Sequence, residues 1–236
     1  MQLGKYISDI HDGSVGFNQS VSDDVVIRNR QKIAEKNGFS PDRIVAMQQA
    51  HTGNCYEVSK KDVGSGTYSF STGIKNVDGL LTVERNIVLL ALSADCPLVS
   101  LYNEEGGVLA VVHSGWRGII NNIIPNMLDL MSKKYACNHK KTHALVAPMA
   151  GLCCYEIQED VRTLFTERFS DEVVKETERG LFLDMKEALK QQLERNLVLT
   201  ENTYISSACT ICDTQYFSYR RQNVEAGRFG LFVWLK

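Results

Sequence analysis

Apolar residues recur at helical spacing in several segments of the chain. The predicted helices are 22–37, 119–131, 158–169 and 184–196. Ser22 or Asp23 can cap the first of them, and Gly38 can end it because glycine tolerates the left-handed backbone found at helix ends. In the second helix, Pro125 either starts the regular part or kinks it.

The last of these helices has the clearest start signal. Asp184 and Glu187 have the spacing of a capping box, in which each side chain accepts a hydrogen bond from the backbone of the other. Leu189, Leu193 and Leu197 follow at a spacing that places them on one helical face. We therefore expect this helix to bury a leucine face against the core.

The middle and the end of the chain contain apolar runs typical of strands. The predicted strands include 44–50, 97–102, 108–112, 145–148 and 229–235. The turn cluster 103–107 joins two of them as a hairpin. Segment 60–66 combines charges with glycine and serine, so we expect a mobile surface loop there, which could also serve as a lid.

The register of this hairpin decides which polar side chains meet at its open end. If Leu101 faces Val108, then Cys96 faces His113. A slip of one residue would turn one of these side chains to the other face of the sheet. The predicted pairing brings a thiol and an imidazole together.

The order of these elements indicates the fold class. Helices and strands do not alternate regularly as βαβ units, which favours an α+β layered domain with a mixed or antiparallel sheet. The chain has 236 residues, 44% of them apolar, and shows neither a linker nor an internal repeat. We expect one domain spanning residues 1–236.

Charge and hydropathy narrow the classes of partner. A formal net charge of −2 gives no bulk attraction to nucleic acid, which argues against a general DNA or RNA binder. No run approaches the about 18 apolar residues of a membrane span. The first residues lack the basic and apolar segments of a secretory signal. We therefore expect a cytoplasmic protein with no nucleic-acid or membrane partner.

Seven cysteines, an odd number, fit a reducing compartment better than a disulfide framework. Cys153 and Cys154 are adjacent and would bridge only with strain. Cys209 and Cys212 form a CxxC pair without the second pair of a zinc ribbon. We expect ordinary free thiols at these four positions.

Three other residues have the composition of a catalytic metal site. His51, Cys96 and His113 supply two imidazoles and one thiolate, which suits a zinc ion that keeps one position open. The same donors also suit copper. The chain has five histidines, too few for a blue-copper laccase with a trinuclear cluster. Each of the three residues on its own is more commonly structural.

Basic and acidic residues near these ligands suggest a substrate site. Arg117 follows His113 at a strand-to-helix turn, where a guanidinium can hold phosphate, although pairing with a carboxylate is the common alternative. Arg220 and Arg228 belong to a second basic cluster that could bind substrate or remain solvated. Asp95 could act as a general base, support a ligand, or be structural.

Several runs of the sequence carry a resemblance to a known family. They are MQQAHTGN, VDGLLT, SADCPLV, VHSGWRG, APMAGLCCYEI and YFSYRR. In this order they resemble the laccase-domain or YfiH-like family, also described as multicopper polyphenol oxidoreductases and as purine nucleoside phosphorylases. The resemblance covers nearly the whole chain. Departures from the usual pattern, such as Ala147, Ala150 and Ala226, remove no metal ligand.

The resemblance implies an α/β/β/α sandwich and zinc binding by His51, Cys96 and His113. It implies phosphorolysis of adenosine, inosine, guanosine or methylthioadenosine, with adenosine deamination as an additional possibility. Phe217 or Tyr219 could then line a purine pocket.

Three other functions stay open at this point. Cys96 could be the nucleophile of an amide hydrolase with His113 as its base, a function related to the peptidoglycan-editing role assigned to part of the family. The protein could be a copper-dependent polyphenol oxidoreductase. It could also be a non-catalytic interaction domain stabilised by zinc.

Overall fold

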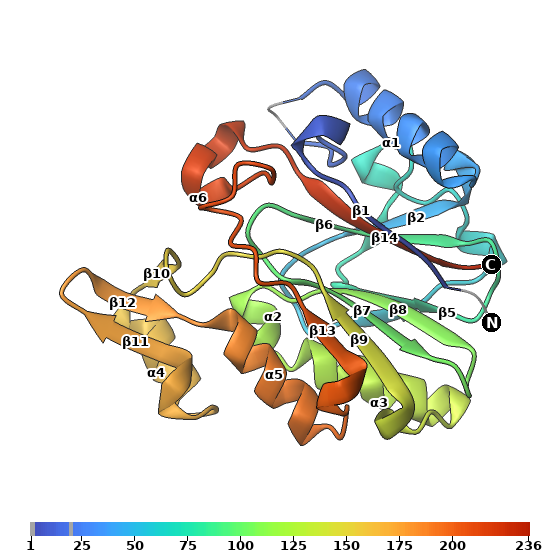
Figure 1. The fold of residues 1–236 in the computed structure, drawn as a ribbon. Helices are drawn as coiled ribbons and strands as arrows, with labels where there is room; N and C mark the ends of the chain where they lie inside the picture. The colour runs from blue at the N-terminus through green and yellow to red at the C-terminus, as the bar shows by residue number, and fades with distance from the viewer. Residues whose placement is uncertain (1–2, 19–20) are drawn as a thin grey trace.

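Two mixed β-sheets lie face to face at the centre of the protein (Figure 1). The computed structural model describes residues 3–18 and 21–236; residues 1–2 and 19–20, which fall within the predicted domain, lie outside the described residues. The five-stranded sheet has the order β1 (Leu3–Ile7), β14 (Phe229–Leu235), β6 (Val88–Ser93), β2 (Ile44–Gln48) and β4 (Ile74–Lys75). The six-stranded sheet has the order β13 (Thr203–Ile205), β9 (Thr142–Val146), β7 (Leu98–Asn103), β8 (Val108–His113), β5 (Gly79–Thr82) and β3 (Cys55–Glu57).

Helices cover the outer faces of both sheets. The α-helices of the described residues are α1 (Asp23–Asn37), α2 (Trp116–Ile120), α3 (Ile123–Tyr135), α4 (Glu159–Thr166), α5 (Met185–Arg195) and α6 (Tyr219–Gln222). α1 packs on the five-stranded sheet, and α2, α3 and α5 pack on the six-stranded sheet (Figure 1). A small sheet of β10 (Glu156–Ile157), β12 (Gly180–Leu183) and β11 (Val174–Thr177) lies beside α4. The expected α/β/β/α sandwich is confirmed.

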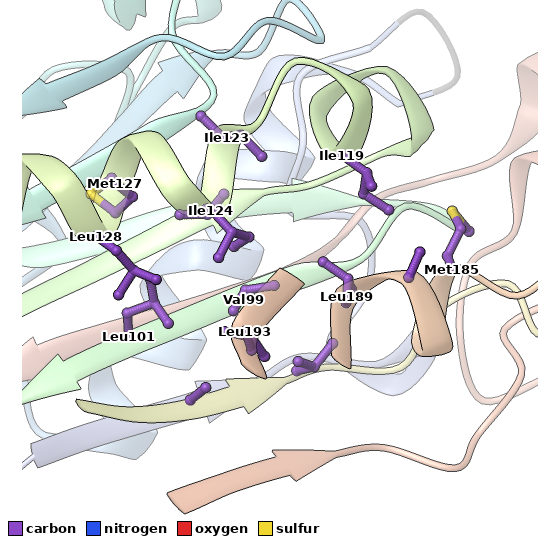
Figure 2. Packing of buried hydrophobic residues seen from close by; sticks show 14 of the residues in the cluster. Val99, Leu101, Ile119, Ile123, Ile124, Met127, Leu128, Met185, Leu189 and Leu193 are labelled. Atoms are coloured by element: carbon purple, nitrogen blue, oxygen red, sulfur yellow. The ribbon is translucent and has the colours of Figure 1, made fainter. Parts of the chain in front are cut away.

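The apolar runs become strands that are buried on both faces. In β8, Val108, Ala110 and Val112 face the helices, whereas Leu109 and Val111 face the other sheet. Because successive side chains of a strand point to opposite faces, such a strand needs apolar residues at every position. Figure 2 shows Leu128 of α3 and Leu193 of α5 gathered over β7 on the helical side.

The helix predictions hold with local corrections. α1 ends as expected at Gly38, whose φ of 72° is left-handed. The predicted helix 119–131 is two helices, because Asn122 takes a φ of 57° between α2 and α3. Pro125 lies in the first turn of α3, where it interrupts no intrahelical hydrogen bond. Within the described residues, none of the helices combines the length and apolar character needed to cross a lipid bilayer.

The leucine face of α5 is shorter than predicted. Asp184 caps the helix by accepting from the Glu187 amide, and Leu189 and Leu193 are buried. Leu197, however, is 57% exposed and has a φ of 65°. The helix has already ended at Arg195, so the helical periodicity no longer governs where Leu197 points.

The hairpin of β7 and β8 is confirmed, but its predicted register was wrong by two residues. Asn103 pairs with Val108, and Leu98 rather than Cys96 pairs with His113. Asn103 continues the strand, and its Oδ1 accepts a hydrogen bond from the Gly106 amide at 2.9 Å, which closes a tighter turn. A two-residue shift keeps every side chain on its face.

Segment 60–66 forms more structure than a plain loop. It begins with a short 3-10 turn, and Asp62 is buried. Tyr56 Oη and the Ser59 amide and hydroxyl donate to the Asp62 carboxylate. The segment does not line the cavity that opens beside His51, Cys96 and His113.

A buried arginine ties the amino-terminal segment to this loop. Arg30 of α1 is 1% exposed; it donates to the carbonyl oxygens of Val15, Gly66 and Thr67 at 2.8, 2.6 and 2.9 Å. Its guanidinium lies 4.6 Å from the centroid of the Phe17 ring. One side chain therefore positions two loops over the edge of the sandwich.

Replacing Arg30 with leucine should lower the free energy of unfolding by about 3 kcal/mol, because three buried carbonyl groups lose a charged donor. Arg28→Leu is the matched control, since Arg28 is exposed on the same helix. It should change stability by less than about 0.5 kcal/mol. Urea unfolding measures both, and equal stabilities would show that the Arg30 contacts contribute nothing.

Candidate metal centre and its cavity

His51, Cys96 and His113 come together from two connections between the sheets and the end of one strand. His51 follows β2, Cys96 lies between β6 and β7, and His113 ends β8. Their ligand atoms all lie within 4.8 Å of one another. The two imidazole rings stand edge to face, with centroids 4.9 Å apart. The hairpin thus brings Cys96 near His113 although the two do not pair.

Asp78, just before β5, holds both histidine segments. The carboxylate is fully buried; its Oδ1 lies 2.8 Å from His113 Nδ1. Its Oδ2 accepts from the amides of Thr52 at 2.6 Å and Ala50 at 3.1 Å, which flank His51. A carboxylate on Nδ1 makes that nitrogen the donor, so Nε2 of His113 is left as the lone-pair nitrogen.

The backbone around Cys96 is shaped to keep its sulfur accessible to the histidines. Ser93 Oγ donates to the Cys96 carbonyl at 2.6 Å. A Cβ at Gly115 would lie 2.8 Å from Cys96 Sγ and 3.4 Å from His51 Cδ2. Any side chain at position 115 would therefore displace the thiol or the imidazole.

The electrostatics of the three groups favour a thiolate. Burial alone would raise the pKa of Cys96, but the charge and hydrogen bond of His113, together with His51, bring it below its usual value. Burial also opposes a charged His113, yet the Cys96 thiolate and Asp78 raise its pKa. The pKa of Asp78 lies below its usual range despite burial, because His113 and Thr52 hydrogen-bond to it.

This donor set fits a tetrahedral metal ion with one open position. A thiolate and two imidazoles are ligands that zinc shares with copper. The carboxylate behind His113 matches the usual arrangement around a histidine ligand. The residues could therefore hold either metal.

A cavity of ≈ 580 Å³ opens beside the three groups. Its volume lies within the range of about 300–1,000 Å³ common for small-molecule sites. His51, Cys96 and His113 line it, and so do Arg117, Arg220 and Arg228. Aromatic side chains supply much of the remaining wall: Phe17, Phe70, Trp116, Tyr155 and Tyr219.

Each of the three arginines lies against an aromatic ring of the wall. The guanidinium carbons of Arg117, Arg220 and Arg228 lie 4.2, 5.0 and 5.9 Å from the centroids of Trp116, Tyr155 and Tyr219. None of the three forms an ion pair with a carboxylate among the described residues. The alternative that the sequence left open, pairing of Arg117 with a carboxylate, is therefore absent from the described part of the chain, and Arg117 is exposed.

Asp95 connects the cavity wall to two other segments. The residue is buried with a φ of 100°; its Oδ1 accepts from Thr210 Oγ1 and its Oδ2 from the Arg220 amide, both at 2.7 Å. Both carboxylate oxygens are engaged, which supports the structural alternative over a general base. The left-handed backbone of Asp95 directs its carboxylate toward Thr210 and Arg220.

Sequence reasoning missed part of the site. The sequence did not reveal that Asp78 hydrogen-bonds to His113, although VDGLLT places an aspartate directly before a predicted apolar run. Phe17 and Phe70 lie in loops without a pattern that would mark them. Of the two aromatic residues that the sequence offered for the pocket, Tyr219 lines the cavity, whereas Phe217 is half-buried and packs against the core between the sheets.

Known proteins are similar to this chain over most of its length. The chain is 31% identical over 213 residues to purine nucleoside phosphorylase YlmD of Geobacillus stearothermophilus, covering 88% of this chain and 78% of that protein. It is 26% identical to the protein of the same name from Bacillus subtilis, covering 94% and 82%.

Two crystal structures share the fold. The structure of YlmD from Geobacillus stearothermophilus has a TM-score of 0.90 at 29% identity, covering 94% of this chain and 84% of that one. The structure of hypothetical protein YfiH from Bacillus licheniformis has a TM-score of 0.91 at 28% identity, covering 94% and 85%. Residues 7–236 match the family described as multi-copper polyphenol oxidoreductase laccase, and the chain belongs to this family.

Proposed function

We propose that this protein is a zinc-dependent purine nucleoside phosphorylase acting on adenosine, inosine, guanosine or methylthioadenosine. The observation that carries the proposal is a His₂Cys group in the wall of a cavity that also contains three arginines without carboxylate partners. The printed names of the relatives support the choice of purine nucleosides and phosphate as substrates.

The arginines suit the anionic substrate. Arg117, Arg220 and Arg228 bring positive charge to one cavity, and a guanidinium fork matches two phosphate oxygens. In phosphorolysis a phosphate oxygen forms a bond to C1′ of the sugar, the bond from C1′ to the base nitrogen breaks, and the base takes up a proton. Holding phosphate against C1′ supplies much of the rate because the reactants are already oriented.

The aromatic wall suits the base. Tyr155, Tyr219 and Phe70 offer flat apolar surface on which a purine can stack. Tyr155 stays protonated, since burial raises its pKa to about 12.

His51, Cys96 and His113 would hold zinc, with Asp78 orienting His113. When bound, zinc supplies a Lewis acid in the cavity wall. Adenosine deamination is the additional reaction this donor set supports, but zinc deaminases also use a carboxylic acid for proton transfer. Asp95 is the only acid among the described residues lining the cavity, and both its oxygens accept hydrogen bonds. Phosphorolysis is therefore the better match.

A second candidate is amide hydrolysis with Cys96 as nucleophile. Cys96, His113 and Asp78 have the order of a thiol, a base and an orienting carboxylate, and the thiol pKa is lowered. A thiolate that holds zinc is a poor nucleophile, so metal content separates the two candidates.

Cys96→Ala should lose about one zinc per chain relative to the unaltered protein, because two imidazoles alone bind zinc weakly. Cys137→Ala is the matched control, since Cys137 is a buried thiol that does not belong to the His51–Cys96–His113 group. Elemental analysis of folded protein measures the content. An unchanged zinc content in Cys96→Ala would contradict the assignment and favour the nucleophile.

Incubation with inosine or adenosine should release free purine and ribose-1-phosphate only when phosphate is present. His113→Ala should abolish the release, because the site loses a ligand that Asp78 orients. His143→Ala, which changes an exposed histidine, should retain it. Chromatography of the products decides, and equal base release without phosphate would instead identify a nucleosidase.

Arg117→Lys should raise the KM for phosphate about tenfold and leave the KM for nucleoside nearly unchanged, because a point charge replaces a bidentate fork. Arg43→Lys, at an exposed position outside the cavity, serves as control. Steady-state kinetics with each substrate varied in turn gives both constants. Equal increases in the two KM values would assign Arg117 to general packing.

A further inference from the structure

Four cysteines that lie far apart in sequence meet at the surface beside the cavity wall. Cys153 and Cys154 follow β9, and Cys209 and Cys212 follow β13. Their sulfur atoms all lie within 4.8 Å of one another, and no histidine or carboxylate belongs to the group. Cys153 Sγ and Cys154 Sγ lie 3.6 and 3.2 Å from Cys212 Sγ. The expectation of four unrelated thiols from the sequence is therefore incomplete.

These separations suit one tetrahedral ion. Zinc lies about 2.3 Å from each thiolate, which places tetrahedral sulfurs about 3.8 Å apart. A disulfide would need sulfurs about 2.05 Å apart, and all seven cysteines are free thiols. Four protein ligands leave no open position, which is the mark of a structural zinc site.

Backbone hydrogen bonds hold the two loops in the conformation that brings the four sulfurs together. Gly151 O accepts from the amides of Cys154 and Tyr155 at 3.0 and 2.9 Å, which forms the turn that carries both adjacent thiols. Cys209 is joined to Met149 by an isolated parallel bridge, and the Thr210 amide donates to Met149 O at 3.0 Å. Two loops that follow paired parallel strands are thereby held side by side.

Backbone amides also point at one of the sulfurs. The Gly151 amide donates to Cys209 Sγ at 3.2 Å. Amide donors stabilise a thiolate, which is the form that binds metal.

We propose that Cys153, Cys154, Cys209 and Cys212 form a tetrathiolate site for one structural zinc ion, separate from the His51–Cys96–His113 group. The proposal does not depend on the reaction proposed above.

The position of this site gives it a role in shaping the cavity. Tyr155 lines the cavity next to Cys154, and Thr210, next to Cys209, donates to Asp95. Asp95 in turn accepts from the Arg220 amide. An ion that joins the two loops would position Tyr155 of the aromatic wall and, through Asp95, the backbone of Arg220 without touching the substrate.

Zinc counting on purified holoprotein tests the proposal. The unaltered protein should contain two zinc ions per chain, and Cys153→Ser/Cys212→Ser should contain one. Both of these cysteines are exposed, so their replacement disturbs packing least. Cys96→Ala should also contain one, and the triple variant none. Cys137→Ser, which removes a thiol outside both groups, should keep two.

Cobalt substitution of the unaltered protein provides a readout that does not depend on whether the double variant folds. Two cobalt sites, one with four sulfur ligands, should give intense sulfur-to-cobalt absorption, most of which survives in Cys96→Ala. A double variant with as much zinc as the unaltered protein would overturn the proposal. Alkylation of all four cysteines in the folded, zinc-loaded protein would also overturn it. So would the finding that the four cysteines bind a metal other than zinc. Because Cys96→Ala reports on the other group, failure here is distinguishable from failure of the proposed function.

Discussion

The carboxylate of Asp78 is the group on which the geometry of the candidate site depends. It binds the imidazole of His113 in the six-stranded sheet and the amides on either side of His51, which follows a strand of the five-stranded sheet. A buried carboxylate is costly unless its oxygens are satisfied. Here that requirement and the placement of two metal ligands are met by the same hydrogen bonds, so the site and the junction between the sheets are stabilised together.

The cavity combines two kinds of wall that its proposed substrates need. Arginines stacked on aromatic rings provide charge without the flexibility of free side chains. Asp95 is the one acidic residue among the described lining residues. Its carboxylate oxygens accept hydrogen bonds from the Thr210 hydroxyl and the Arg220 amide. The local charge is therefore positive in a protein whose net charge is −2, which explains why composition alone shows no anion site.

Much of the fold could be predicted from local patterns. The errors arise where the hydrogen bonding of a turn, a single left-handed residue or the pairing of distant strands decides the structure. Strand 229–235 was predicted with its observed bounds because its apolar run is a local signal, and Gly38 ends α1 as expected because a helix stop is local too. The register of the hairpin depended on how Asn103 bonds to the turn, and the end of α5 on the left-handed Leu197, which no spacing reveals. The cysteine cluster was missed because its halves meet only after β9 and β13 pair.

The ligands of the candidate metal centre are divided between the two sheets, and this has a consequence for folding kinetics. His51 follows β2 of one sheet, His113 ends β8 of the other, and Cys96 lies in the connection that crosses between them. The complete set of ligands exists only after the sheets have packed. Metal binding would therefore contribute little to a transition state in which the sheets are still apart, and it would act mainly by slowing unfolding. The ion would prolong the lifetime of the native sandwich rather than speed its formation.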